Sequence, residues 1–127
     1  MKQPYADLLA TGRKTIEIRK WNTNFRGPFL IHASKNIIKD ACLNLGIDEN
    51  NLVKGAIIGK AFLYKVMRYS TKEAFSDDHQ KHFSIEDIKS NHSFKRYGFL
   101  VKDAIKFKEG IPYLGKLGFF EVTDLSI

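Results

Sequence analysis

The spacing of apolar residues predicts a helix followed by a strand at the start of the chain. Apolar side chains recur three and four residues apart within Gln3–Ala10, which indicates a short amphipathic helix. Gly12 directly follows it, where a left-handed residue is expected to end the helix. Apolar and polar residues then alternate over Thr15–Trp21, which predicts a strand with Ile16 and Ile18 facing the core.

The remaining chain contains two predicted helices and four predicted strands. The segment Ile37–Leu45 has helical spacing and is followed by Gly46, and Ser70 with Glu73 indicates the N-terminal cap of another short helix. Gly59 is expected to permit a bulge in the longest run. The first two strands are expected to pair as a hairpin. The predicted strands after the first are Arg26–Ser34, Gly55–Tyr69, Tyr97–Phe107 and Gly118–Val122.

This arrangement predicts an α+β fold, namely a small mixed β-barrel of about five strands with peripheral helices. With 127 residues and no internal linker or repeat, the chain is expected to form a single domain over residues 1–127.

The distribution of charge points to an anionic partner. The formal net charge is +7, and the residues up to Lys39 include eight Lys and Arg but only Asp7 and Glu17 as acids. Six of the seven net positive charges therefore lie in the first third of the chain. A local surplus of this kind favours nucleic acid or another phosphorylated ligand.

Other features limit the possible classes of protein. Cys42 is the only cysteine, which excludes an internal disulfide and a multi-cysteine zinc site. No apolar run is long enough for a membrane helix, so we expect a soluble, cytoplasmic protein with no membrane partner. No cofactor or metal is expected, because the segment with Asp77, Asp78, His79 and His82 reads as a solvated loop. The sequence leaves the oligomeric state open.

The most informative motif is Gly12-Arg13-Lys14-Thr15-Ile16-Glu17-Ile18-Arg19. Residues two apart on a strand point to the same side, so Glu17 and Arg19 are expected to pair, with Lys14 at the entry to the strand. These side chains form either a polar functional site or a structural ion pair at the corner between helix and strand. His32, on the second strand, is expected to be a core residue whose ring is hydrogen-bonded.

The motif and its surroundings resemble the ASCH domain, a member of the PUA-like superfamily. The resemblance rests on Lys2–Leu9, on the motif itself with Trp21, and on Arg26–Ser34, and it extends to Gly55–Gly59 and Tyr97–Phe99. It implies a small β-barrel with peripheral helices and a cleft beside the first helix. The superfamily is associated with RNA binding, including the recognition of modified bases. Some ASCH proteins are amidohydrolases of N4-acetylcytidine, and others are ribonucleases.

We therefore predict a nucleic-acid-binding module that uses a basic cleft around the G-x-K-x-x-E-x-R motif, with RNA as the expected partner. Phe25 is expected to be the most exposed stacking residue, whereas Tyr5 packs its helix and Trp21 closes the barrel. The candidate RNA-contacting residues are Arg13, Lys14, Arg19, Lys20, Phe25, Arg26, Lys35 and Lys39.

The alternatives are a small hydrolase of a modified nucleoside or of RNA, and an interaction domain without a ligand of its own. An amidohydrolase would use Lys14, Glu17 and Thr15 as its catalytic residues. In the amidohydrolase subgroup, however, a threonine occupies the place of Glu17. Because a carboxylate is not a hydroxyl nucleophile, this difference favours binding over catalysis.

Overall fold

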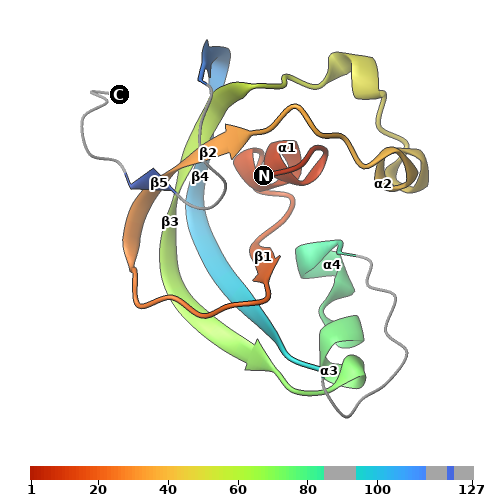
Figure 1. Cartoon of the computed structure of the whole chain (residues 1–127), viewed down its shortest axis with the longest axis vertical. Coiled ribbons are helices and arrows are strands. Elements are labelled where there is room, and N and C mark those ends of the chain that lie inside the picture. The colour runs from red at the N-terminus through yellow and green to blue at the C-terminus, as the bar shows by residue number, and fades with distance from the viewer. Residues whose placement is uncertain (85–93, 114–119, 122–127) are drawn as a thin grey trace.

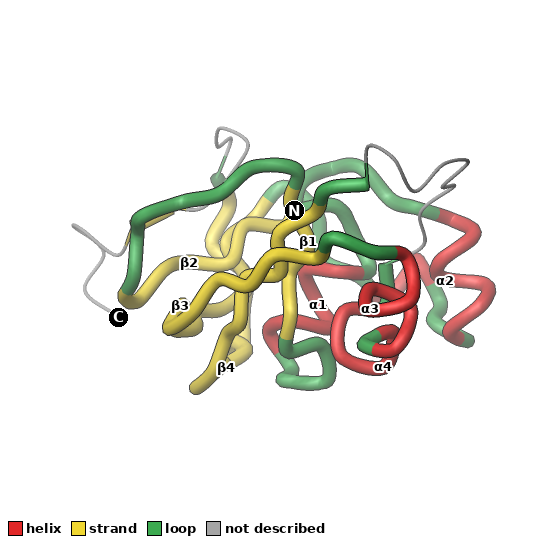
Figure 2. The backbone as a smooth tube through the Cα atoms, turned by 90° about the horizontal axis from the view of Figure 1, so that it is seen from below, coloured by secondary structure: helices red, strands yellow, loops and turns green. Residues whose placement is uncertain are grey.

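The protein is a curved antiparallel sheet with helices on one side (Figures 1 and 2). The computed structural model describes residues 1–84, 94–113 and 120–121. The sheet order is β1-β4-β3-β2-β5, and all the neighbouring strands are antiparallel. The strands are β1 (Ile16–Arg19), β2 (Gly27–Ala33), β3 (Ala56–Tyr69), β4 (Arg96–Pro112) and β5 (Phe120–Glu121).

The α+β class is confirmed, but a closed barrel of about five strands is not. Four strands form the main sheet, β5 adds two residues at one edge, and among the described residues β1 does not pair with β5. The predicted hairpin of the first two strands is wrong. β1 pairs with β4, whereas β2 pairs with β3 and β5, so two strands separate β1 from β2. Alternation predicts that a segment is a strand but carries no information about its partner.

The helices are short, and several end or begin where the sequence predicts. α1 (Tyr5–Ala10) and α2 (Lys39–Leu45) match the two helices expected from apolar spacing, and Gly46 ends α2 with a φ of +66°. The predicted cap at Ser70 is one residue early, because the Thr71 hydroxyl accepts from the Ala74 amide at the start of α3. The other helices are η1 (Glu49–Asn51), α3 (Lys72–Asp77) and α4 (His79–His82).

The main core lies between α1 and the concave face of the sheet (Figure 1). Leu9 and Ala10 pack there with apolar side chains of β2, β3 and β4. The predicted irregularity at Gly59 is confirmed, because the β3–β4 register shifts beside it. A Cβ at Gly59 would overlap the carbonyl oxygen of Ile105 and lie 3.2 Å from Cβ of Ala10. The absence of a side chain therefore lets α1 and β4 approach β3 closely.

A second, smaller cluster of apolar side chains lies at the end of the sheet where β3 finishes and β4 begins. Tyr69, Phe75 and Phe94 form it, with Ile18 and Met67 packed against it. Most of the predicted strand Gly118–Val122 lies outside the described residues. In the part of the chain that the structure describes, no helix is long and apolar enough to cross a membrane.

Candidate nucleic-acid interface

The G-x-K-x-x-E-x-R motif forms the corner between α1 and β1. Gly12 has a φ of +80°, which confirms the predicted left-handed stop, and its amide donates to the Leu9 carbonyl. The Lys14 amide then donates to the Leu8 carbonyl at 2.9 Å. A left-handed residue at this point reverses the chain directly from the helix into the strand. The Lys14 side chain is thereby turned into the protein.

Lys14 is buried rather than available at the surface. Its side chain is 0% exposed, and Nζ lies 3.0 Å from Oε1 of Glu17. The ammonium also donates to the carbonyl oxygen of His82 at 2.6 Å and lies 4.6 Å from the centre of the Tyr5 ring. These contacts satisfy the ammonium within the protein, so the position of Lys14 does not match its predicted role as a direct phosphate contact.

Glu17 joins the two cations of the motif. Its Oε2 lies 2.6 Å from Nη1 of Arg19, so the predicted Glu17–Arg19 pair is present, and its side chain is only 4% exposed. Alternation implied that Glu17 faces away from the core. Its cross-strand neighbour Phe99 belongs to the main core, however, so Glu17 lies on the core-facing side of the sheet. Lys14, Glu17 and Arg19 form one ion network, which we call the motif triad.

Burial and charge act in opposite directions on the triad. Burial lowers the pKa of Lys14 below its ordinary value, and the Glu17 carboxylate opposes that shift only in part. Burial alone would raise the pKa of Glu17, but the charges of Lys14 and Arg19 outweigh it and hold that pKa below its usual range. Glu17 is therefore ionised at neutral pH.

Thr15 does not join the triad. It precedes β1 and is exposed, whereas Glu17 is 3% exposed. Its backbone amide donates to the Lys81 carbonyl, and its carbonyl accepts from the Val101 amide. Within the described residues, the hydrogen-bonding partners of Lys14 Nζ include no hydroxyl group.

His82 corrects the expectation of a solvated loop before β4. It is fully buried, with Nε2 at 2.7 Å from the Phe75 carbonyl, and Nδ1 accepts from the Ser84 amide. The ring is thus neutral with its proton on Nε2, and burial lowers the pKa of His82. Both ring nitrogens are occupied, so His82 is not a metal ligand. Within the described ranges, no three His, Cys, Asp or Glu side chains are grouped closely enough to hold a metal ion.

His32 behaves as the sequence predicts. It is 7% exposed, and its Nε2 lies 2.8 Å from the Tyr113 carbonyl, so its ring is hydrogen-bonded in a mostly buried site. This contact joins β2 to the end of β4.

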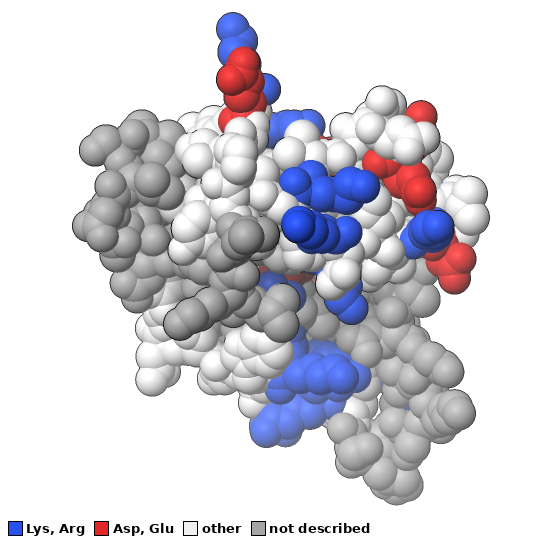
Figure 3. Space-filling model, turned by 45° about the horizontal axis from the view of Figure 1, so that its top comes forward, with Lys and Arg blue, Asp and Glu red and all other residues white. Residues whose placement is uncertain are grey.

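Most of the remaining predicted basic residues are exposed. The Arg13 guanidinium lies 5.4 Å from the centre of the Phe83 ring, and Arg26 donates to the carbonyls of Thr23 and Phe25. None of the following five residues forms an ion pair within the part of the chain that the structure describes: Arg13, Lys20, Arg26, Lys35 and Lys39. On the face shown in Figure 3, basic side chains form an upper and a lower group, and most of the acidic side chains in view lie toward the top and the right.

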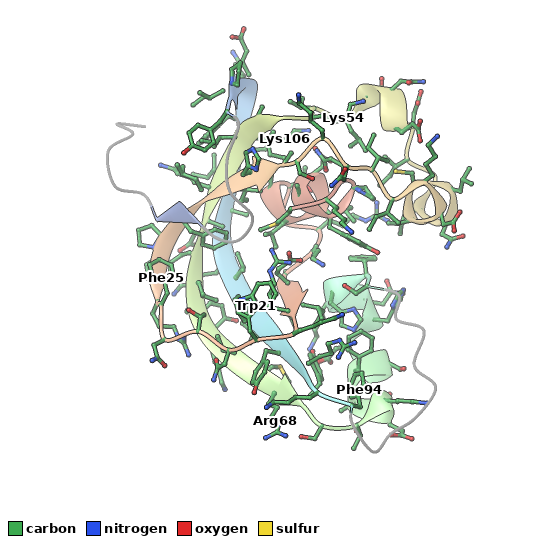
Figure 4. The ribbon with its side chains drawn as sticks, in the orientation of Figure 1. Trp21, Phe25, Lys54, Arg68, Phe94 and Lys106 are labelled. Atoms are coloured by element: carbon green, nitrogen blue, oxygen red, sulfur yellow. The ribbon has the colours of Figure 1, made fainter. Side chains whose placement is uncertain are left out.

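The aromatic candidates do not have the expected exposures. Trp21, which was expected to close the barrel, is 54% exposed. Phe25, which was expected to be the most exposed stacking residue, is half-buried against the main core. Tyr5 is half-buried over Lys14, consistent with a packing role. Figure 4 shows Phe25 beside β2 and Trp21 near β1.

Sequence reasoning missed three cations that the sheet places near the motif. Arg68 and Arg19 are both cross-strand neighbours of Tyr97, and Lys95 and Arg96 immediately precede Tyr97. Their separation along the chain hides this proximity. Only the strand order could have revealed it, and the predicted hairpin gave the wrong order.

The family model for the ASCH domain matches residues 1–110, and the chain belongs to this family. ASCH domains have a PUA-like fold associated with RNA binding.

Solved structures of an ASCH protein from Zymomonas mobilis share the fold. A Tyr-to-Phe variant of that protein has a TM-score of 0.57 and 17% identity, with 88% of this chain and 71% of that chain covered. The unsubstituted protein has a TM-score of 0.56 and 16% identity, over 88% and 69% of the two chains. A search of curated proteins found no match.

Proposed function

We propose that this ASCH domain binds RNA through the basic surface around the G-x-K-x-x-E-x-R corner. The observation that carries the proposal is the set of exposed cations without acidic partners in the described structure: Arg13, Lys20, Arg26, Lys35 and Lys39. Cations that are not neutralised within the protein attract phosphates and release counterions on binding. The family's association with RNA supports the same conclusion.

In this proposal the motif triad is a scaffold. Lys14 and Glu17 neutralise each other below the surface, and Arg19 connects them to the end of β1. Arg13 directly precedes Lys14 and Lys20 directly follows Arg19, so the triad holds the segment from which both exposed cations project. Lys14 then acts through the geometry of its neighbours rather than by touching RNA.

The proposal is tested by fluorescence anisotropy with a labelled, mixed-sequence single-stranded RNA of about a dozen nucleotides. The triple variant Arg13→Glu/Lys20→Glu/Lys39→Glu is compared with a matched control that reverses three other exposed lysines. The control residues are Lys65, Lys102 and Lys108, on β3 and β4.

We expect the variant Arg13→Glu/Lys20→Glu/Lys39→Glu to lose most of its affinity for RNA and the control variant to lose much less. In a salt titration, each lost phosphate contact should reduce the slope of log K against log salt by about 0.7. Equal losses in the two triples would contradict a localised site. Absence of RNA binding by the wild-type protein at low salt would overturn the proposal.

The hydrolase alternative is tested separately. Amide hydrolysis would need a neutral lysine next to a nucleophile, and burial does lower the pKa of Lys14. Its ammonium is nevertheless enclosed by Glu17, His82 and Tyr5. We therefore expect little or no acetate when the pure protein is incubated with N4-acetylcytidine. Turnover that is lost in Lys14→Ala would favour the hydrolase instead.

A further inference from the structure

Three strands bring cations and aromatic rings together at one end of the sheet. In the register of the sheet, Arg19 of β1 and Arg68 of β3 flank Tyr97 of β4. Residues in one cross-strand row point to the same face, so these three side chains are neighbours. Lys20 and Trp21 continue the chain directly beyond Arg19.

The exposed ring of Trp21 and the half-buried ring of Tyr97 each have a cation beside them. The Arg19 guanidinium lies 5.6 Å from the centre of the Trp21 ring, and Lys95 Nζ lies 5.7 Å from the centre of the Tyr97 ring. Trp21 is 54% exposed, so much of the indole remains accessible. Figure 4 shows Trp21 near β1 and Arg68 near the far end of β3.

The side chains of Arg19, Trp21, Arg68 and Tyr97 form what we call the platform. The motif triad fixes the Arg19 side of this platform. Arg19 is 17% exposed and held by Glu17 at 2.6 Å, and Glu17 is in turn held by Lys14. The guanidinium beside Trp21 is therefore positioned before any ligand binds. A preorganised contact loses less conformational entropy on binding than a mobile one.

Three other cations at this end have no acidic partner within the described residues. Lys20, Arg68 and Lys95 are exposed, and none of them forms an ion pair in the part of the chain that the structure describes. An aromatic ring among free cations matches the alternation of bases and phosphates in a single strand.

We propose that Trp21 stacks on an unpaired base of single-stranded RNA, while Lys20, Arg68 and Lys95 contact the flanking phosphates. This inference rests on the proposed RNA-binding function and assigns the position at which a base is held. An acidic peptide would use the same cations but would gain little from an accessible indole.

The chain offers a direct probe, because Trp21 is its only tryptophan. Titration with an unlabelled oligouridine of about eight nucleotides, excited selectively at tryptophan, should quench the emission. The quenching should saturate over the same concentration range as anisotropy measured with the labelled form of that RNA. Trp21→Leu should weaken binding about 5- to 150-fold, the range that corresponds to loss of one stacked base.

Matched variants separate stacking from general effects. Trp21→Phe should restore most of the affinity because it retains a stacking ring. Tyr64→Leu removes another exposed ring with a lysine beside it, on β3, and should have little effect on RNA affinity. Arg68→Gln/Lys95→Gln should reduce the salt slope by about 1.4. Circular dichroism verifies that each variant is folded.

The outcomes distinguish the two proposals. If RNA binds but Trp21 emission does not change and Trp21→Leu binds like the wild type, the stacking site is wrong and the RNA-binding function stands. If no RNA binds to the wild-type protein, both proposals fail. Equal quenching by an oligoglutamate peptide, with equal loss in Trp21→Leu, would overturn the assignment of this platform to RNA.

Discussion

Replacement of Glu17 by glutamine tests whether the motif triad is the buried ion network that holds the corner. The substitution keeps the shape of the side chain but removes a carboxylate that lies 3.0 Å from Lys14 Nζ and 2.6 Å from Arg19 Nη1. Removal of one partner of a buried ion pair costs about 3–5 kcal/mol, because the other charge remains buried without compensation. The stability of a typical domain is about 5–15 kcal/mol, so this loss is large.

The assay is urea unfolding at pH 7 followed by circular dichroism. With an m-value of about 2 kcal/mol/M, a loss of about 4 kcal/mol lowers the midpoint by about 2 M. Glu109→Gln is the matched control, since Glu109 is an exposed carboxylate on β4, and it should change stability by less than about 0.5 kcal/mol.

The dependence on pH adds an independent readout. Burial lowers the pKa of Lys14, and without Glu17 nothing in the triad opposes that shift. Between the lowered pKa of Lys14 in the folded variant and its pKa of about 10.4 in the unfolded chain, the unfolded state binds more protons than the folded state. The free energy of unfolding of the variant therefore rises with pH in this range. The deficit of Glu17→Gln should therefore shrink between pH 7 and pH 9.5. A deficit below about 1 kcal/mol at pH 7, or one independent of pH, would refute the reasoning.

Three further predictions concern single positions. Gly12→Val should destabilise the protein by about 1–2 kcal/mol in thermal unfolding, because Gly12 has a φ of +80°, whereas Gly12→Asn should cost less. Gly59→Ala should cost more than 2 kcal/mol, or prevent folding, because the new Cβ overlaps the backbone oxygen of Ile105; a cost below 1 kcal/mol would contradict the close approach of β4. Burial lowers the pKa of His82, so the free energy of unfolding should fall as the pH drops below about 6.5, where the histidine of the unfolded chain takes up a proton. This decline should be smaller in His82→Gln. An equal decline in the variant would contradict the assignment to His82.

Local features of the fold were predictable from the sequence. Gly12 and Gly46 both adopt the left-handed conformation expected at a helix end, and Gly59 lies at the expected bulge. Each of these features depends on a few adjacent residues, for which spacing and residue type are sufficient.

Features that depend on strand order were not predictable in the same way. The predicted hairpin is wrong, since β1 lies beside β4 and not beside β2. The exposures of Trp21 and Phe25, which lie between β1 and β2 in the chain, are the reverse of those expected. Lys14 reads as a surface cation in the sequence, yet Glu17 and the backbone of His82 compensate for its burial. The polar composition around His82 gave no indication that backbone groups of Phe75 and Ser84 would satisfy its ring.

The pairing of β1 with β4 determines when the motif is assembled during synthesis. Arg19 lies opposite Tyr97, so the corner encoded near the start of the chain gains its neighbouring strand only about 80 residues later. At a translation rate of about 5–20 residues per second, the ribosome needs roughly 4–16 s to supply that strand. During this interval β1 lacks its partner strand, although the most basic part of the chain, up to Lys39, has already been made. The motif can therefore be ordered only after β4 has been made.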